Sequence, residues 1–214
     1  MRKFLITLLF LFFVQLGTFA ADYIPSYVNA NVFLGEGFIT SSDEISVYKD
    51  KDENSEVLAK LNKTVIKSKY NPSVQNVYIA SVKDKNLYLL PVRSNEDEWF
   101  EVCISQKDKV FGWVKKNDFI DYLSIQDFYN FFGRKNGLYL FRNVSDSYKK
   151  LYASPDFNAA VVDTFFYPKH ISVWLLAREW MLVKITTYDG QTKTGWLKWK
   201  LNDGSVIVFP NLID

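Results

Sequence analysis

The chain has 214 residues and carries 26 Lys and Arg against 24 Asp and Glu, a formal net charge of +2. Arg2 and Lys3 lie in an N-terminal segment that we expect to be removed, which leaves 24 residues of each sign and no net charge. A neutral chain lacks the basic surface with which proteins bind nucleic acid or anionic lipid. Cys103 is the only cysteine, so no internal disulfide forms and packing must stabilise the fold.

The first twenty residues have the three parts of a cleavable secretory signal. The basic Arg2 and Lys3 precede an apolar run over residues 4–16, and small residues lead to a cleavage site between Ala20 and Ala21. The alternative is an uncleaved membrane anchor, but a spanning helix needs about 20 apolar residues and this run is shorter. No cysteine stands directly after the apolar run, where a lipid anchor would be attached. No later segment is long and apolar enough to span a membrane. We therefore expect an exported protein, periplasmic or extracellular, without membrane insertion.

An internal repeat organises the rest of the chain. Residues 48–61 align without a gap with residues 152–165, so that the two segments share a leading Tyr, an Asp, an Asn and a Val. Two more blocks follow in the same order in each half. A strand begins at Trp99 or Trp180, and a Gly-Trp-aliphatic step follows at residues 112–114 or 195–197. The order of these blocks predicts two copies of one domain.

Each copy has the pattern of a small β domain. A Tyr enters a loop rich in Asp and Asn, whose side chains stabilise turns. Apolar residues then alternate along residues 100–104 and 181–185, and turns are expected at residues 106–109 and 188–191. Copy one has an extra hairpin at residues 77–92, where Pro91 predicts an edge strand.

The segment between the copies has a helical pattern. Ser124 is placed to cap a helix over residues 125–132, with Gly133 as the residue after its end. The helix is too apolar for a free linker, so we expect it to pack between the two domains or against one of them. The chain then divides into a signal peptide (1–20), domain 1 (21–122), a helical linker (123–136) and domain 2 (137–214).

Copy two contains LYASPDFNAAVV at residues 151–162, followed by EWMLVKI and TGWLK, and resembles bacterial SH3 (SH3b-type) domains. Copy one, with YKDKDEN, resembles them more loosely, and the family's Asn-Val-Arg-Ser-Gly pattern is absent from both copies. The resemblance implies an all-β fold of two small SH3-like half-open barrels in tandem. It also implies a non-catalytic role in binding cell-wall glycopeptide, peptides or another envelope protein.

Aromatic residues are the candidate ligand surface, because flat rings stack on sugars and extended peptides. The Trp residues of the Gly-Trp steps precede core-facing residues and should point away from the core, and those that begin strands are out of phase with the buried set. The alternative is that the rings close the barrel ends or the interface between copies. The candidate residues are Tyr48, Trp99, Trp113, Tyr152, Trp180 and Trp196. Trp174 and Trp199 are assigned to packing.

Other candidate chemistry is weaker. Cys103 lies within an alternating strand, away from the helix start that lowers the pKa of a nucleophilic thiol, and His170 is expected in a solvated loop. One Cys and one His cannot form a zinc site, and the acidic run at residues 95–98 lacks the spacing of a calcium loop. We expect no catalytic residue, metal or cofactor.

The sequence therefore favours an exported, non-catalytic binding module that recognises cell-wall glycopeptide or an extended peptide through Tyr/Trp grooves. The alternative is a structural protein that docks on another cell-envelope protein. A cysteine hydrolase built on Cys103 is the third and least favoured hypothesis. The expected partners are a cell-wall polymer, a peptide or an envelope protein, and not nucleic acid.

Overall fold

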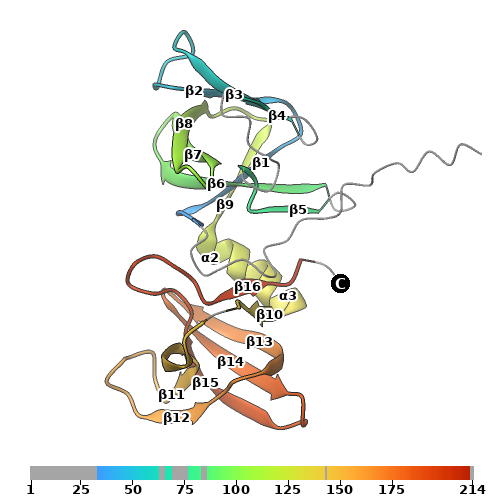
Figure 1. The fold of residues 1–214 in the computed structure, drawn as a ribbon, viewed down its shortest axis with the longest axis vertical. Coiled ribbons are helices and arrows are strands. Elements are labelled where there is room, and N and C mark those ends of the chain that lie inside the picture. Colours follow the sequence, from blue (N-terminus) through green and yellow to red (C-terminus); the bar gives the residue numbers. More distant parts are fainter. Residues whose placement is uncertain (1–32, 63–65, 69–76, 83–85, 143, 213–214) are drawn as a thin grey trace, which may run out of the picture.

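The structure is a computed structural model that describes residues 33–62, 66–68, 77–82, 86–142 and 144–212. The expected signal peptide, with Ala20 and Ala21, lies outside the described residues. Within the described ranges, no helix has the length and apolar character needed to cross a membrane. The fold is all-β, as predicted, with two antiparallel sheets joined by a short helical segment (Figure 1).

The first sheet is built from the N-terminal half of the chain. Its strands follow the order β4-β3-β2-β8-β7-β6-β1-β9, and β5 pairs with β6. Their side chains enclose a core that includes Val47, Leu90 and Val102, all fully buried. The strands are β1 (Gly37–Ser41), β2 (Ile45–Tyr48), β3 (Val57–Leu61), β4 (Ile66–Ser68), β5 (Ala80–Val82), β6 (Leu87–Asn95), β7 (Trp99–Ser105), β8 (Val110–Lys115) and β9 (Ile120–Ser124).

The second sheet is built from the C-terminal half, in the order β12-β11-β15-β14-β13-β10-β16. The predicted alternation holds in β14, where Met181, Val183 and Ile185 are fully buried. A 3-10 turn, η2 (Asp146–Tyr148), precedes β11. The strands are β10 (Leu138–Leu140), β11 (Lys150–Tyr152), β12 (Val161–Thr164), β13 (Pro168–Ala177), β14 (Trp180–Thr187), β15 (Thr192–Lys198) and β16 (Val208–Pro210).

The sequence repeat is also a repeat of strand register. Tyr48 pairs with Trp113 in the first sheet, and Tyr152 pairs with Trp196 in the second. Each Tyr also lies beside a β-bulge, across which it pairs with the repeated Val57 or Val161. In the loop between, the Asn backbone N–H donates to the Asp side chain at 2.9 Å in copy one and 2.8 Å in copy two. The Asp and Asn therefore recur because both loops need the same turn.

The glycine before each second Trp is required by a close approach between strands. A Cβ on Gly112 would lie 2.9 Å from the carbonyl oxygen of Tyr48 and closer still to Val47. A Cβ on Gly195 would lie 3.2 Å from the carbonyl oxygen of Tyr152 and 2.8 Å from the Leu151 Cβ. The same crossing of two strands therefore occurs in both sheets.

The predicted extra hairpin of copy one is formed by β5 and β6, but the edge position expected from Pro91 is wrong. Strand β6 lies inside the sheet, between β1 and β7. It pairs with β5 through Leu89 and with β7 from Val92 onward. Pro91 falls in the break between these two partners, where its missing N–H costs no ladder hydrogen bond.

The helical segment begins as predicted and ends later. The Ser124 hydroxyl accepts a hydrogen bond from the Asp127 N–H at 3.1 Å and caps the helix. The segment then runs through α2 (Ile125–Phe128), a π-helical turn η1 (Tyr129–Gly133) and α3 (Arg134–Asn136). The end predicted at Gly133 is wrong, because Gly133 is helical and Gly137, with φ 77°, ends the helix. Gly133 instead allows Leu138 and Val173 to approach.

This helix packs between the two sheets and joins their cores (Figure 1). The Phe128 ring lies 4.8 Å from Phe38 of β1 and 5.4 Å from Phe209 of β16, measured between centroids. The Tyr129 hydroxyl is fully buried and donates to the carbonyl oxygen of Val208 at 2.7 Å. Burial of these two side chains therefore connects both halves.

We expect Phe128→Ala to lower the free energy of unfolding by about 3–5 kcal/mol, because it opens a cavity in the shared core. Urea denaturation followed by far-UV circular dichroism measures this change. Phe131→Ala is the matched control on the same helix, since Phe131 is 60% exposed, and should change stability by less than about 0.5 kcal/mol. Equal losses from both variants would contradict the shared core.

Candidate functional site

Each sheet places two Trp, a Tyr, a Lys and a Glu together where its Tyr strand crosses its Gly-Trp strand. We call this cluster the aromatic corner. The backbone pairs Trp99 with Lys115 in the first sheet and Trp180 with Lys198 in the second. The first aromatic corner contains Tyr48, Glu98, Trp99, Trp113 and Lys115, and the second contains Tyr152, Glu179, Trp180, Trp196 and Lys198.

The two aromatic corners share their ring geometry. The Tyr48 and Trp99 centroids lie 6.1 Å apart at an interplanar angle of 89°. The Tyr152 and Trp180 centroids lie 5.3 Å apart at 86°. Edge-to-face packing of this kind is favourable between aromatic rings and fixes their orientation.

A lysine ammonium group lies between a carboxylate and a Trp ring in both corners. Lys115 Nζ is 3.6 Å from Glu98 and 5.5 Å from the Trp99 ring centroid. Lys198 Nζ is 3.1 Å from Glu179 and 5.9 Å from the Trp180 ring centroid. The carboxylate and the ring face both attract the cation. The sequence carries a signal for this arrangement, because a Glu precedes each strand-starting Trp and a Lys stands three residues after each Gly.

The candidate aromatic residues differ in how far they are exposed. Trp99 and Trp180 are each only 8% exposed, so their rings form the floor of the corner rather than an open groove. Tyr48, Tyr152, Trp113 and Trp196 are half-buried. The Trp113 ring is covered in part by Lys51 Nζ, 4.3 Å from its centroid, and Lys51 forms an ion pair with Glu96.

The two corners differ at several aligned loop positions. At one of them, Glu53 in copy one and Phe157 in copy two each contact the lysine of their corner. The Phe157 ring packs 5.2 Å from Trp180, and Lys198 Nζ lies 4.0 Å from its centroid. Phe157 thus helps to bury the Lys198 side chain, which is 7% exposed. Glu53 instead forms a 3.5 Å ion pair with Lys115, whose side chain stays 40% exposed. The first corner is therefore open where the second is filled.

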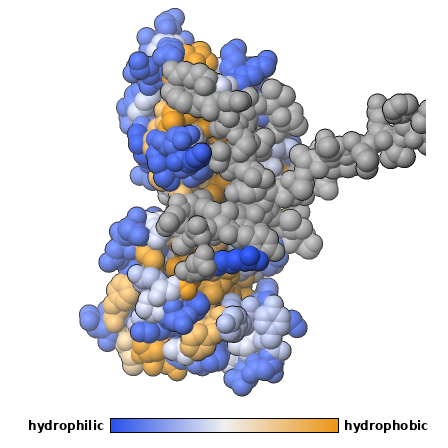
Figure 2. Space-filling model, viewed as in Figure 1, coloured by the Kyte–Doolittle hydropathy of each residue, from blue (hydrophilic) through white to orange (hydrophobic). Residues whose placement is uncertain are grey.

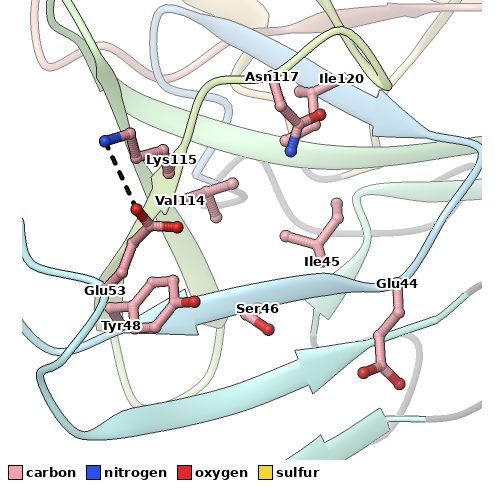
Figure 3. A pocket seen from close by; sticks show the side chains of 9 residues that line it. All are labelled: Glu44, Ile45, Ser46, Tyr48, Glu53, Val114, Lys115, Asn117 and Ile120. Atoms are coloured by element: carbon pink, nitrogen blue, oxygen red, sulfur yellow. Dashed lines mark ion pairs between the residues drawn. The ribbon is translucent and has the colours of Figure 1, made fainter.

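A pocket of about 160 Å³ lies beside the first aromatic corner (Figure 3). Figure 3 shows the Tyr48 ring and the Glu53–Lys115 ion pair on one side and Glu44 on the other. Small-molecule sites usually measure about 300–1,000 Å³, so this pocket suits one side chain or substituent of a larger ligand. Its lining residues are Glu44, Ile45, Ser46, Tyr48, Glu53, Val114, Lys115, Asn117 and Ile120.

The acidic run, residues 95–98, is exposed and leads through the turn from β6 to β7. Glu96 and Glu98 are paired with Lys51 and Lys115, and with Asp97 and Trp99 they line a shallow depression. In the part of the chain that the structure describes, no group of three or more His, Cys, Asp or Glu is arranged to hold a metal ion.

Cys103 and His170 lie in different sheets. Cys103 is fully buried in β7, and burial raises the pKa of its thiol to about 11. His170 is exposed, but its predicted loop position is wrong because it belongs to β13. A thiol in this state is a poor nucleophile at neutral pH, since the thiolate is the reactive form.

The two Trp residues assigned to packing have different surroundings. Trp199 is 1% exposed, and its indole N–H donates to the carbonyl oxygen of Arg178 at 2.9 Å. Trp174 is 48% exposed, so that assignment is wrong. A register shift between Val173 and Leu175 interrupts the alternation of β13 at this residue.

No protein-family model matches the chain, and no curated protein matches it significantly. The geometry of the two aromatic corners is therefore the basis for assigning a function. In both corners the same Tyr, Trp, Lys and Glu recur, but Glu53 contacts the lysine of the first corner and Phe157 that of the second.

We expect the Cys103 thiol to resist a disulfide reagent at pH 8 in the native protein and to react at once in urea. The unfolded thiol has a pKa of about 8.5, so the folded state keeps its proton to higher pH and loses stability as pH rises from about 8.5 toward 11. The Cys103→Ala variant should lack the part of this pH-dependent loss of stability that the thiol causes. Rapid, complete labelling of the native protein would contradict the buried position.

Proposed function

We propose that the chain is an exported, non-catalytic binding protein of the cell envelope, with two SH3b-like barrels. Its ligand is the peptide part of cell-wall glycopeptide or another extended peptide. The observation that carries the proposal is the difference between the two aromatic corners. The same Tyr, Trp, Lys and Glu are present twice, but Phe157 fills the second corner and leaves the first as the binding site.

The lining of the first pocket supports a polar, charged ligand group. Glu44 and Glu53 offer carboxylates, Lys115 offers a partly exposed ammonium group, and Tyr48 offers a ring. A group with both an amine and a carboxylate, as in cell-wall peptides, complements this set. The small volume indicates that the pocket holds one residue of a chain whose remainder lies on the surface.

The position of the only cysteine supports a non-catalytic role. A hydrolase of the cysteine type needs an activated thiolate close to a base. Burial raises the pKa of Cys103, which is the opposite of activation, and His170 is on the other sheet. The binding hypothesis needs neither residue.

Exchange of the residues at the aligned position of Glu53 and Phe157 tests the proposal. Glu53→Phe should fill the first corner as Phe157 fills the second, and should abolish co-sedimentation of the mature protein with purified cell-wall sacculi. The matched control, Phe157→Glu, alters the equivalent position of copy two and should leave binding intact. Wild-type binding should weaken with added salt, because ionic contacts at an exposed site are screened.

Three results would contradict the proposal. Absence of wild-type binding at every salt concentration would exclude recognition of the polymer. Full binding by a correctly folded Glu53→Phe variant, verified by its circular dichroism spectrum, would exclude the first corner as the site. Loss of binding in Phe157→Glu alone would assign the site to copy two.

A structural role, docking on another envelope protein, is the second candidate. It is favoured by apolar side chains that are exposed on the C-terminal half, including Phe166, Tyr167, Trp174 and Leu175. Figure 2 shows apolar surface over this half of the molecule. Failure of the wild type to bind sacculi would favour this role over polymer recognition.

A further inference from the structure

The repeat places β3 and β12 at equivalent positions, but only β3 has a partner on its outer side. Strand β4 pairs with it in antiparallel register, with Lys67 opposite Lys60 and Ile66 opposite Leu61. Strand β12 is the last strand in the order of the second sheet, and its outer edge is unpaired among the described residues. In copy one, an antiparallel strand therefore covers the edge that is open on β12 in copy two.

Backbone groups on β12 point toward that open side. The Phe165 N–H donates to the Lys149 carbonyl oxygen beside β11. Because successive residues of a strand direct their backbone groups to opposite sides, Thr164 directs its N–H and C=O away from β11. Thr164 aligns with Lys60, the residue that β4 covers in copy one.

In the single chain, polar side chains form hydrogen bonds with the outward N–H and C=O of Thr164. The Thr164 N–H donates to Asp163 Oδ1 at 2.7 Å, and Lys193 Nζ donates to the Thr164 carbonyl oxygen at 2.7 Å. Lys193 also forms a 2.7 Å ion pair with Asp163, whose side chain is 38% exposed. Partly exposed ion pairs contribute little stability, so another strand can displace this cap.

Apolar side chains surround the edge. Val161 is 48% exposed, Val162 52%, Phe166 50% and Tyr167 81%. Leu58, which aligns with Val162, is only 5% exposed in copy one. Scattered exposed apolar residues are ordinary, but a cluster beside an open strand edge marks an interaction surface.

We propose that the β12 edge pairs with the β12 edge of a second copy of this chain to form a symmetric dimer. Antiparallel pairing of a strand with itself is symmetric about a two-fold axis, so one edge serves as both donor and acceptor. Asp163 and Lys193 provide opposite charges next to each other, and each can pair with the opposite charge of the second copy across the axis. The mature chain, with 24 residues of each sign, carries no net charge that would keep the copies apart.

Sedimentation equilibrium of the mature chain over a range of concentrations tests this dimer. The wild type should sediment as a dimer and dissociate on dilution. Thr164→Pro should be monomeric, because proline removes the outward N–H without breaking a hydrogen bond to β11. Val161→Lys should also lose the dimer, because it places a charge in the apolar cluster of each copy.

Val57→Lys is the matched control for Val161→Lys. Val57 aligns with Val161 and is similarly exposed, at 43%, but β4 covers the edge of its strand. This variant should remain dimeric. A far-UV circular dichroism spectrum like that of the wild type should show that all three variants are folded. The proposal is overturned by a monomeric wild type at all concentrations, by a dimer that survives Thr164→Pro, or by loss of the dimer in Val57→Lys.

Discussion

Each sheet is organised by the close approach of a glycine to the carbonyl oxygen of a tyrosine. Gly112 and Gly195 have no side chain that would separate the Gly-Trp strand from the Tyr strand. With the strands this close, the Tyr ring packs edge-to-face with a buried Trp, and the lysine paired with that Trp lies near the Trp ring. The aromatic corner is therefore a consequence of how two strands cross.

Because the two corners share this scaffold, the difference between the residues that contact their lysines, Glu53 and Phe157, carries the functional assignment. Phe157 continues the aromatic packing of the second corner, contacts Trp180 and covers the lysine. Glu53 cannot pack in this way, so it forms an ion pair with Lys115 and leaves a polar pocket beside Tyr48. We interpret copy two as the closed form of a site that is open in copy one.

The blocks of the repeat, the turns between strands and the capping Ser124 could be predicted from the sequence, because each depends on neighbouring residues. The burial of Trp99 and Trp180 could not be derived from strand alternation, since both lie outside the alternating core set. Each packs against a Tyr and a Lys from other strands. Trp174 and Pro91 were misplaced for a related reason. A register shift exposes Trp174, and a change of partner strand accommodates Pro91, and neither event leaves a local pattern.

The most direct test of the account compares Lys115 and Lys198 in one measurement. Brief acetylation of the native protein with an amine reagent, followed by mass spectrometry of its peptides, gives the modified fraction at each lysine. We predict extensive modification of Lys115, whose side chain is 40% exposed, and protection of Lys198, whose side chain is 7% exposed. Equal modification of the two lysines, or faster modification of Lys198, would contradict the claim that one corner is open and the other filled.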